Sequence, residues 1–401
     1  MKNNKVLLSR LSYLSAFSMF ALVVGCGGDG GSSGSDQPNP NPNPNPNPGV
    51  SNSTTHVATL AELQNMECRA GSNVILDADI TISGTWQPLC GASGFKGTFD
   101  GAGKTISFQQ ATVENVLLAD GTFAVGLFGL VEGTIKNLTV AGDFTHQAAN
   151  GHNTFMGAIA GASEGTIKDS KSTAHLTLNQ TFTQLAFLGG IVGSLEDGTL
   201  EHVAATGNLK LDHSAFSGGY AGGIVGGLYD NATLDGCYNV GTVENNTNSP
   251  VIQGKVTLRG TGGIAGRLAG LVTLKNCYTK SGDVVGATDG DYTATIVGQV
   301  KGTTGANISN TVALSNSISG ATLGTPIATS FGEMGSISMS NNYYESNYTS
   351  SGALRFTVGK PVDLTDTEDQ RWWEATSNLN FDFTQVWKWD AQALRPVFIW
   401  E

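Results

Sequence analysis

The amino-acid sequence predicts an all-β fold, a parallel β-helix (solenoid) with a cap at its N-terminal and C-terminal ends. A block of small, small, aliphatic, aliphatic and glycine residues recurs six times, and its closing glycines lie 32, 32, 33, 40 and 32 residues apart. Glycine makes up 54 of 401 residues and charged residues only 13%, against about 25% charged residues in ordinary domains. A period of this length and such a composition are typical of stacked strands joined by tight corners.

Residues 1–25 are expected to be an export signal. Lys2, Lys5 and Arg10 precede an apolar run over residues 11–24, which is shorter than the roughly 20 residues that a membrane-spanning helix needs. An uncleaved membrane anchor is the alternative interpretation of this run.

The end of the run, Leu22-Val23-Val24-Gly25-Cys26, resembles a bacterial lipobox, in which the signal is cut before the cysteine. The resemblance implies that Cys26 becomes a lipidated amino terminus carrying acyl chains such as palmitate, which hold the protein on a membrane. Gly27, rather than Asp, follows the cysteine. In lipoproteins of Gram-negative type this is typical of the outer membrane, so we expect an exported protein at the outer membrane or cell surface.

Residues 26–56 are expected to be a tether. The first part, up to Asp36, is rich in glycine and serine, and the Pro-Asn alternation that follows ends at Pro48. Such alternation favours an extended rod of about 3.1 Å per residue. The folded part is therefore predicted to stand away from the lipid.

Residues 57–122 are assigned to an N-terminal cap and first coil. They contain Cys68 and Cys90, and in an exported chain two nearby cysteines favour a disulfide. Cys237 and Cys277 lie instead at equivalent repeat positions. We predict that these two stack as buried free thiols rather than as a bridge.

Residues 123–350 are assigned to the repeats, whose blocks supply the inward-facing core. The first aliphatic residue of each block should point inward, and the closing glycine should let another sheet come close. The inward stack is predicted to consist of Leu127, Ile159, Ile191, Ile224, Ile264 and Ile296.

A second element follows each block, with apolar residues three positions apart, as in Ile135 and Leu138. A straight strand would place them on opposite faces, so the chain must bend between them. The residue at the bend is always of a type that tolerates a left-handed backbone. These corner residues are Asn137, Asp169, His202, Gly236, Asn276 and Asn310.

Strand, corner, strand and a variable third segment together describe one coil of a β-helix. A β-propeller is the alternative, because its repeats can also be near 40 residues long. Its blades, however, need four alternating strands joined by hairpin turns, which this pattern does not show.

Residues 351–401 are assigned to an aromatic C-terminal cap, since they hold five of the six tryptophans. We expect them to form a plug over the last coil, where a solenoid leaves an open end. A platform on which a ligand stacks is the alternative.

The repeats also resemble a known family. The blocks Gly189-Gly190-Ile191-Val192-Gly193 and Gly222-Gly223-Ile224-Val225-Gly226, each followed by an element of the type Gly-Thr-Ile/Leu-x-Asn-Cys-Tyr, are similar to the GLUG motif repeats of bacterial surface proteins. The similarity covers roughly residues 94–345, although the first and sixth copies lack the Gly-Gly pair. It implies a right-handed β-helix outside the cell, in adhesin-like proteins or in the non-catalytic front part of some immunoglobulin-cutting metalloproteases.

The sequence offers no catalytic constellation, metal site or cofactor motif. No histidine is followed by glutamate, so the His-Glu-x-x-His zinc arrangement is absent. The histidines do not line up in the repeat, and Asp289-Gly290-Asp291, which hints at a cation site, is more typical of a turn. Charged residues recur just before the corners with varying sign, as in a solvated ladder: Lys136, Lys168, Glu201, Asp235 and Lys275.

These observations favour a lipid-anchored surface β-helix that binds an extracellular glycan or protein through its outer face and loops, the longest being residues 244–260. A carbohydrate-active β-helix enzyme, either a polysaccharide lyase or a hydrolase, and a purely structural surface protein are the alternatives. A net charge of -12 argues against nucleic acid as a partner, because such binding depends on clusters of Lys and Arg. The membrane is expected as a partner only through the lipid anchor.

Overall fold

The computed structural model describes residues 53–148, 151–180, 184–213, 218–247, 259–280, 282–286, 292–301, 305–315, 317–319, 323–331, 337–350 and 359–401. They belong to one compact unit, Asn52–Glu401. The predicted signal, Cys26 and nearly all of the tether lie outside the described residues. Among the described residues, no helix is both long and apolar enough to cross a membrane.

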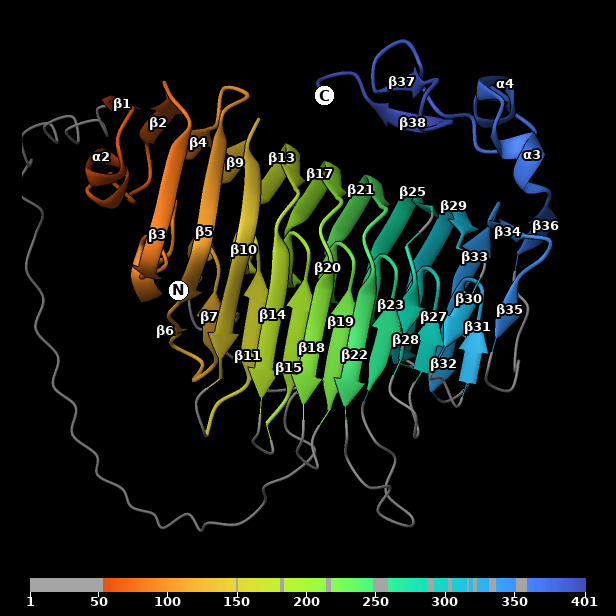
Figure 1. The fold of residues 1–401 in the computed structure, drawn as a ribbon, viewed down its shortest axis with the longest axis horizontal. Helices are drawn as coiled ribbons and strands as arrows, with labels where there is room; N and C mark the ends of the chain where they lie inside the picture. The colour runs from red at the N-terminus through yellow and green to blue at the C-terminus, as the bar shows by residue number, and fades with distance from the viewer. Residues whose placement is uncertain are drawn as a thin grey trace, which may run out of the picture. The chain divides into compact units, whose positions relative to one another are not determined.

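The fold is a parallel β-solenoid, as predicted (Figure 1). Each turn adds one strand to each of two small sheets and then passes through a large sheet. The first small sheet contains β6 (Val116–Leu117), β7 (Phe123–Val125), β11 (Thr154–Gly157), β15 (Ala186–Gly189), β19 (Gly219–Gly222), β23 (Gly260–Gly262), β27 (Tyr292–Ala294) and β31 (Leu323–Thr325). The second contains β8 (Phe128–Val131), β12 (Ala160–Ser163), β16 (Val192–Glu196), β20 (Val225–Tyr229), β24 (Ala265–Ala269), β28 (Val297–Lys301) and β32 (Ala328–Phe331).

The large sheet has 21 strands among the described residues. They are β1 (Ser53–Val57), β2 (Ser72–Leu76), β3 (Ile80–Trp86), β4 (Thr98–Asp100), β5 (Thr105–Val113), β9 (Thr134–Lys136), β10 (Thr139–Gln147), β13 (Thr166–Ser172), β14 (His175–Gln180), β17 (Thr199–Ala205), β18 (Leu209–His213), β21 (Thr233–Asn239), β22 (Val243–Thr247), β25 (Thr273–Lys280), β26 (Val284–Val285), β29 (Asn307–Leu314), β30 (Ser317–Ser319), β33 (Ser338–Ser340), β34 (Tyr343–Glu345), β35 (Thr349–Ser350) and β36 (Lys360–Val362).

Consecutive turns are held together by parallel pairing in register. Ile167 of β13 pairs with Leu200 of β17, which pairs with Leu234 of β21, and so on along the sheet. A propeller blade is an antiparallel unit, so this pairing rejects the propeller alternative. The third segments, expected to vary, also begin with paired strands, as when Leu176 of β14 meets Leu209 of β18.

The predicted core stack is confirmed, since all six of its aliphatic side chains have an exposed fraction of 0%. The structure adds a seventh copy at β31 and β32, where Ile327 has an exposed fraction of 1%. The sequence pattern missed this copy because Pro326 precedes the aliphatic residue and Thr329 replaces the closing glycine.

From the second copy onward, the closing glycines allow the two small sheets to touch. A Cβ atom on Gly193 of β16 would lie 2.4 Å from the backbone nitrogen of Met156 in β11, and one on Gly298 of β28 would lie 2.4 Å from that of Thr261 in β23. A side chain of any size would push these backbones apart, so glycine is needed here for close approach rather than for flexibility.

The six predicted corners are confirmed, because each has a positive φ between 47° and 71°. A seventh corner, Asn341, has a φ of 56°. Side-chain amides link the corners of neighbouring turns: Asn310 donates to Oδ1 of Asn276 at 3.1 Å, and Asn341 donates to Oδ1 of Asn310 at 2.8 Å. Polar corner residues therefore satisfy one another along the solenoid.

The N-terminal segment extends the same sheet. β4 pairs with β9, and β5 pairs with β10. The short helix α2 (Leu60–Gln64) begins with a capping box between Thr59 and Glu62, and a single 3-10 turn, η1, covers Gly91–Ser93. The sulfurs of Cys68 and Cys90 lie 2.06 Å apart and form a disulfide.

The prediction of free thiols at Cys237 and Cys277 was wrong, because the structure joins them as a second disulfide. The two residues do stack as register neighbours of β21 and β25. That stacking brings their Cα atoms to 4.5 Å, which lies inside the range that a disulfide spans. Equivalent repeat positions thus provide the geometry for a bridge.

The predicted plug over the last coil was also wrong in its position. Residues 359–401, here called the C-terminal strap, run back along one side of the solenoid (Figure 1). After β36 the strap contains α3 (Leu364–Thr367), α4 (Gln370–Glu374) and the antiparallel hairpin β37 (Trp387–Asp390) and β38 (Arg395–Phe398). The face of the large sheet on which the strap lies is here called the wall. The aromatic side chains of the strap cover the wall because it carries a row of apolar side chains there.

Candidate binding groove

One row of side chains decides where the strap lies. The row stands two residues after each corner and passes from turn to turn in register. Its members are Thr105, Thr139, Lys171, Ala204, Tyr238, Tyr278, Val312 and Tyr343. The row is polar in its first three turns and mostly aromatic or aliphatic in the last five.

The strap covers the apolar part of this row. Trp373 packs edge to face on Tyr278 with ring centroids 5.1 Å apart, and Trp372 meets Tyr343 at 5.2 Å. Trp373 has an exposed fraction of 0%, and its indole nitrogen donates to the carbonyl of Thr367 at 2.8 Å. Burial of large rings with a satisfied polar atom makes Trp373 the main anchor of the strap.

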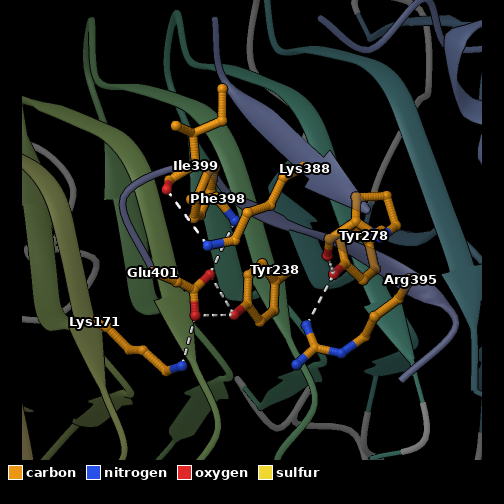
Figure 2. A network of polar contacts seen from close by, with 9 residues as sticks. Lys171, Tyr238, Tyr278, Lys388, Arg395, Phe398, Ile399 and Glu401 are labelled. Atoms are coloured by element: carbon orange, nitrogen blue, oxygen red, sulfur yellow. Dashed lines mark hydrogen bonds and ion pairs between the residues drawn. The ribbon is translucent and has the colours of Figure 1, made fainter. Parts of the chain in front are cut away.

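A polar network holds the far end of the strap at the point where the row changes from polar to apolar side chains (Figure 2). The Glu401 carboxylate accepts hydrogen bonds from Lys171 at 2.6 Å and from the hydroxyl of Tyr238 at 2.7 Å. The backbone nitrogen of Phe398 donates to the same carboxylate at 3.0 Å. Burial raises the pKa of Tyr238 far above its ordinary value, so its hydroxyl keeps the proton that it donates.

A second set of contacts holds the hairpin. Arg395 donates to the hydroxyl of Tyr278 at 3.1 Å (Figure 2), and the Arg395 guanidinium lies 4.6 Å from the centroid of the Tyr238 ring. Lys280 donates to the carbonyl of Leu394 at 2.6 Å. Together with Glu401 these contacts fix the strap end in one position on the wall.

A groove of about 370 Å³ opens beyond this strap end. Its floor is formed by three successive turns of the wall, and one rim is formed by the last two residues of the strap. The lining residues are Ala102, Gly103, Asn137, Leu138, Thr139, Asp169, Lys171, Thr173, Trp400 and Glu401. The groove therefore occupies the polar part of the row, where the strap ends.

Trp400 is the aromatic group of the groove. Its ring stacks on Phe398 with centroids 5.4 Å apart and planes inclined by 11°, and Phe398 in turn stacks on Trp387 at 4.3 Å. The Trp400 side chain nevertheless has an exposed fraction of 37%. It is thus the exposed end of a buried aromatic pile, held in place from below.

The charges of the groove are paired. The Asp169 carboxylate lies 3.1 Å from Nδ1 of His202, which can be protonated. The Glu401 carboxylate lies 2.6 Å from the ammonium group of Lys171. Burial lowers the pKa of His202, but the hydrogen bond to Asp169 and the charges of Asp169, Glu201 and Asp235 outweigh it and raise the pKa above 6.5. The lining itself carries two carboxylates and one ammonium group.

The ladder of charged residues before the corners is partly buried and internally paired. Lys136 contacts Asp100 at 3.0 Å, and Lys275 contacts Asp235 at 2.9 Å. Lys168 and Glu201 are register neighbours. Opposite charges therefore alternate with like charges along the ladder, since Lys136 also neighbours Lys168 and Glu201 neighbours Asp235. This varying sign supports the interpretation of a ladder in contact with solvent.

The other residues that the sequence singled out do not come together at one site. His202 occupies a corner, whereas His146 contacts the carbonyl of Val113 and His152 that of Gly121. Within the residues that the structure describes, no group of three His, Cys, Asp or Glu side chains is placed to hold a metal ion. Asp289-Gly290-Asp291 and most of the 244–260 loop lie outside the described residues.

Sequence reasoning did not find the groove. Lys171, Trp400 and Glu401 carried no motif, and Asp169 was singled out only as a corner. The signal that existed was the residue two places after each corner, which changes from Thr139 and Lys171 to Tyr238 and Tyr278. Reading that position across the turns shows where the wall is polar and where it is aromatic.

No family model and no curated protein matches this chain. Its structure is similar to that of a "putative immunoglobulin A1 protease from Bacteroides ovatus", with a TM-score of 0.55 and 19% sequence identity. The similarity covers 88% of this chain and 94% of the other. At this level of identity the likeness shows the shared β-solenoid fold alone.

Proposed function

We propose that this chain is an exported, lipid-anchored β-solenoid of the cell surface that binds an extracellular glycan or protein. The observation that carries the binding role is the groove, where the exposed ring of Trp400 is held rigidly beside polar side chains. Binding sites commonly combine an apolar surface with a few fixed polar groups in a concave place.

The surface location rests on the sequence. The lipobox-like segment ending at Cys26, the Pro-Asn tether and the resemblance to GLUG-repeat surface proteins support it. The two disulfides, Cys68–Cys90 and Cys237–Cys277, suit an oxidising compartment outside the cytosol.

Cleavage of immunoglobulin, which the name of the Bacteroides ovatus protein suggests for that protein, is not part of the proposal for this chain. The sequence has no His-Glu pair, so the His-Glu-x-x-His zinc motif cannot be built from it. Capture of a partner is the activity that a rigid wall with a fixed groove supports.

Two assays test the proposal. Cells that export the full-length chain are fed a clickable palmitate analogue, and incorporation should disappear in Cys26→Ser. The same cells are then layered on immobilised mucin and fibronectin, and retention should exceed that of cells lacking the protein. If the cells are retained on neither mucin nor fibronectin, the binding role is contradicted.

The enzyme alternative is tested with the purified full-length chain in detergent. It is incubated with alginate, polygalacturonate and mannan, and the reactions are followed for unsaturated products and new reducing ends. Turnover of any of these polymers would replace the binding proposal by a carbohydrate-active enzyme. Absence of both turnover and retention would favour a purely structural surface protein.

A further inference from the structure

We infer that the groove between the strap end and the polar part of the row binds an uncharged sugar unit, stacked on Trp400. This inference rests on the proposed function and names the class of ligand and the residues that select it. Three independent features of the groove lead to it: the aromatic ring, the arrangement of polar groups, and the balance of charge.

The aromatic ring provides a flat apolar surface at fixed height. One side of Trp400 lies against Phe398, and the pile continues through Trp387 to Phe381, whose ring centroid is 4.8 Å from that of Trp387. Because the ring is already immobilised, little side-chain entropy is lost when a ligand stacks on its exposed part. The C–H face of a pyranose ring complements such a surface, because the negative face of an aromatic ring attracts the weakly positive C–H hydrogens.

The polar groups of the groove match hydroxyl groups. Asn137 and Asp169 stand on adjacent corners, Thr139 begins β10, and Thr173 directly follows β13; all four line the groove. Carboxylates accept hydrogen bonds, whereas amides and hydroxyls both donate and accept them. A sugar carries several hydroxyls around one ring and needs this mixture of partners.

The charge of the lining selects against acidic sugars. Both carboxylates, Asp169 and Glu401, lie on the same small groove as the single ammonium group of Lys171, which is already engaged with Glu401 at 2.6 Å. A uronate or sulfated sugar would bring another negative charge into a site whose cation is occupied. The volume of about 370 Å³ lies near the lower end of the range for small-molecule sites and fits a short glycan segment.

The test uses the full-length chain in detergent and a panel of neutral tetrasaccharides of glucose, mannose, galactose and N-acetylglucosamine, with tetragalacturonate as the acidic probe. Binding is measured by titration calorimetry. We expect at least one neutral tetrasaccharide to bind and tetragalacturonate to bind more weakly. Trp400→Ala should weaken neutral binding by about ten-fold, and Trp400→Phe should restore part of it.

Ile399→Ala is the matched control, because Ile399 is next to Trp400, has an exposed fraction of 44% and does not line the groove. It should bind as the unmodified protein does. Asp169→Asn should narrow the preference for neutral over acidic probes, since it removes one negative charge from the lining. Urea midpoints measured for each variant show that the fold is retained.

The outcomes separate the two proposals. Neutral binding that is unchanged in Trp400→Ala, or stronger binding of tetragalacturonate than of every neutral probe, overturns the inference. Binding of no tetrasaccharide, together with retention on mucin or fibronectin, overturns the inference and leaves the proposed function standing. Failure in both assays removes the proposed function as well.

Discussion

The covered and the open halves of the row that passes through Lys171 differ in their side chains and not in their backbone. Under the strap, Tyr238 and Tyr278 stack with ring centroids 5.2 Å apart and are both fully buried. Beyond it, Thr139 and Lys171 take the same register position and line an open groove. The repeat builds the wall, and a single position in the repeat determines whether the wall is closed or available.

Apolar burial explains which part of the row the strap covers. Large rings at the row give the strap aromatics a surface to bury, whereas threonine and lysine do not. Glu401 pairs with Lys171, which is the polar residue of the row next to its apolar half. Four changes test this comparison, from the largest expected effect to the smallest.

Loss of the main anchor should release the strap while the wall remains. Trp373→Ala removes a fully buried ring that packs on Tyr278 and Phe381, and we expect a loss of about 3–5 kcal/mol for strap docking. Hydrogen exchange should become fast in residues 359–401 and stay slow in the coils. Trp400→Ala, at an exposed position, serves as control and should change exchange little; equal effects of the two variants would contradict the assignment of the anchor.

A change in the wall should affect both halves of the row alike. Gly193→Ala would place a Cβ atom 2.4 Å from the backbone nitrogen of Met156, and we expect a loss of about 1–3 kcal/mol in the free energy of unfolding. At the equivalent position of the first copy, a Cβ atom on Gly129 would come no closer than 3.3 Å to side-chain atoms of Val116 and 3.4 Å to the carbonyl oxygen of Gly91. Gly129→Ala should therefore shift the urea midpoint much less, and a larger shift there would argue against close sheet contact as the cause.

The boundary ion pair should matter only locally. Lys171→Ala leaves the Glu401 carboxylate with the Tyr238 hydroxyl and one backbone donor. For a partly exposed pair we expect a loss of about 1 kcal/mol or less, seen as faster exchange near Phe398. Lys136→Ala breaks an ion pair in the wall instead, at 3.0 Å from Asp100, and should leave exchange in the strap unchanged.

The smallest effect concerns pH. The pKa of His202 is raised above 6.5 in the folded protein, so its protonation stabilises the fold below that pH, and this contribution is lost as the pH rises through the folded-state pKa. As the pH falls from about 8.5 to about 5.5, the unmodified protein should gain stability relative to Asp169→Asn, in which His202 lacks its charged partner. Urea midpoints at the two pH values measure the difference, and parallel curves for both proteins would exclude the pair as its source.

The wall was predictable because its constraints are local. The left-handed backbone at Asn276 or His202 follows from residue type, and the burial of Ile191 follows from its place in the block. The solenoid class, the corners and the core stack could all be derived from period and alternation.

The strap and the groove were not predictable in the same way, because they depend on contacts between segments that are far apart in sequence. Tyr278 and Trp373 are 95 residues apart in the chain, yet their rings touch. The aromatic composition of residues 351–401 indicated burial but not against which face. The pairing of Cys237 with Cys277 escaped for a related reason: stacking was inferred, but not the short distance that it imposes.

The link between Cys237 and Cys277 has a consequence for how the chain responds to proteolysis. Any single cut in the chain between these two residues leaves the fragments covalently joined through neighbouring rungs. Such a nicked molecule would migrate as one species without reductant and as two with it. The longest insertion of the repeats can therefore be severed without the part that carries the strap being shed.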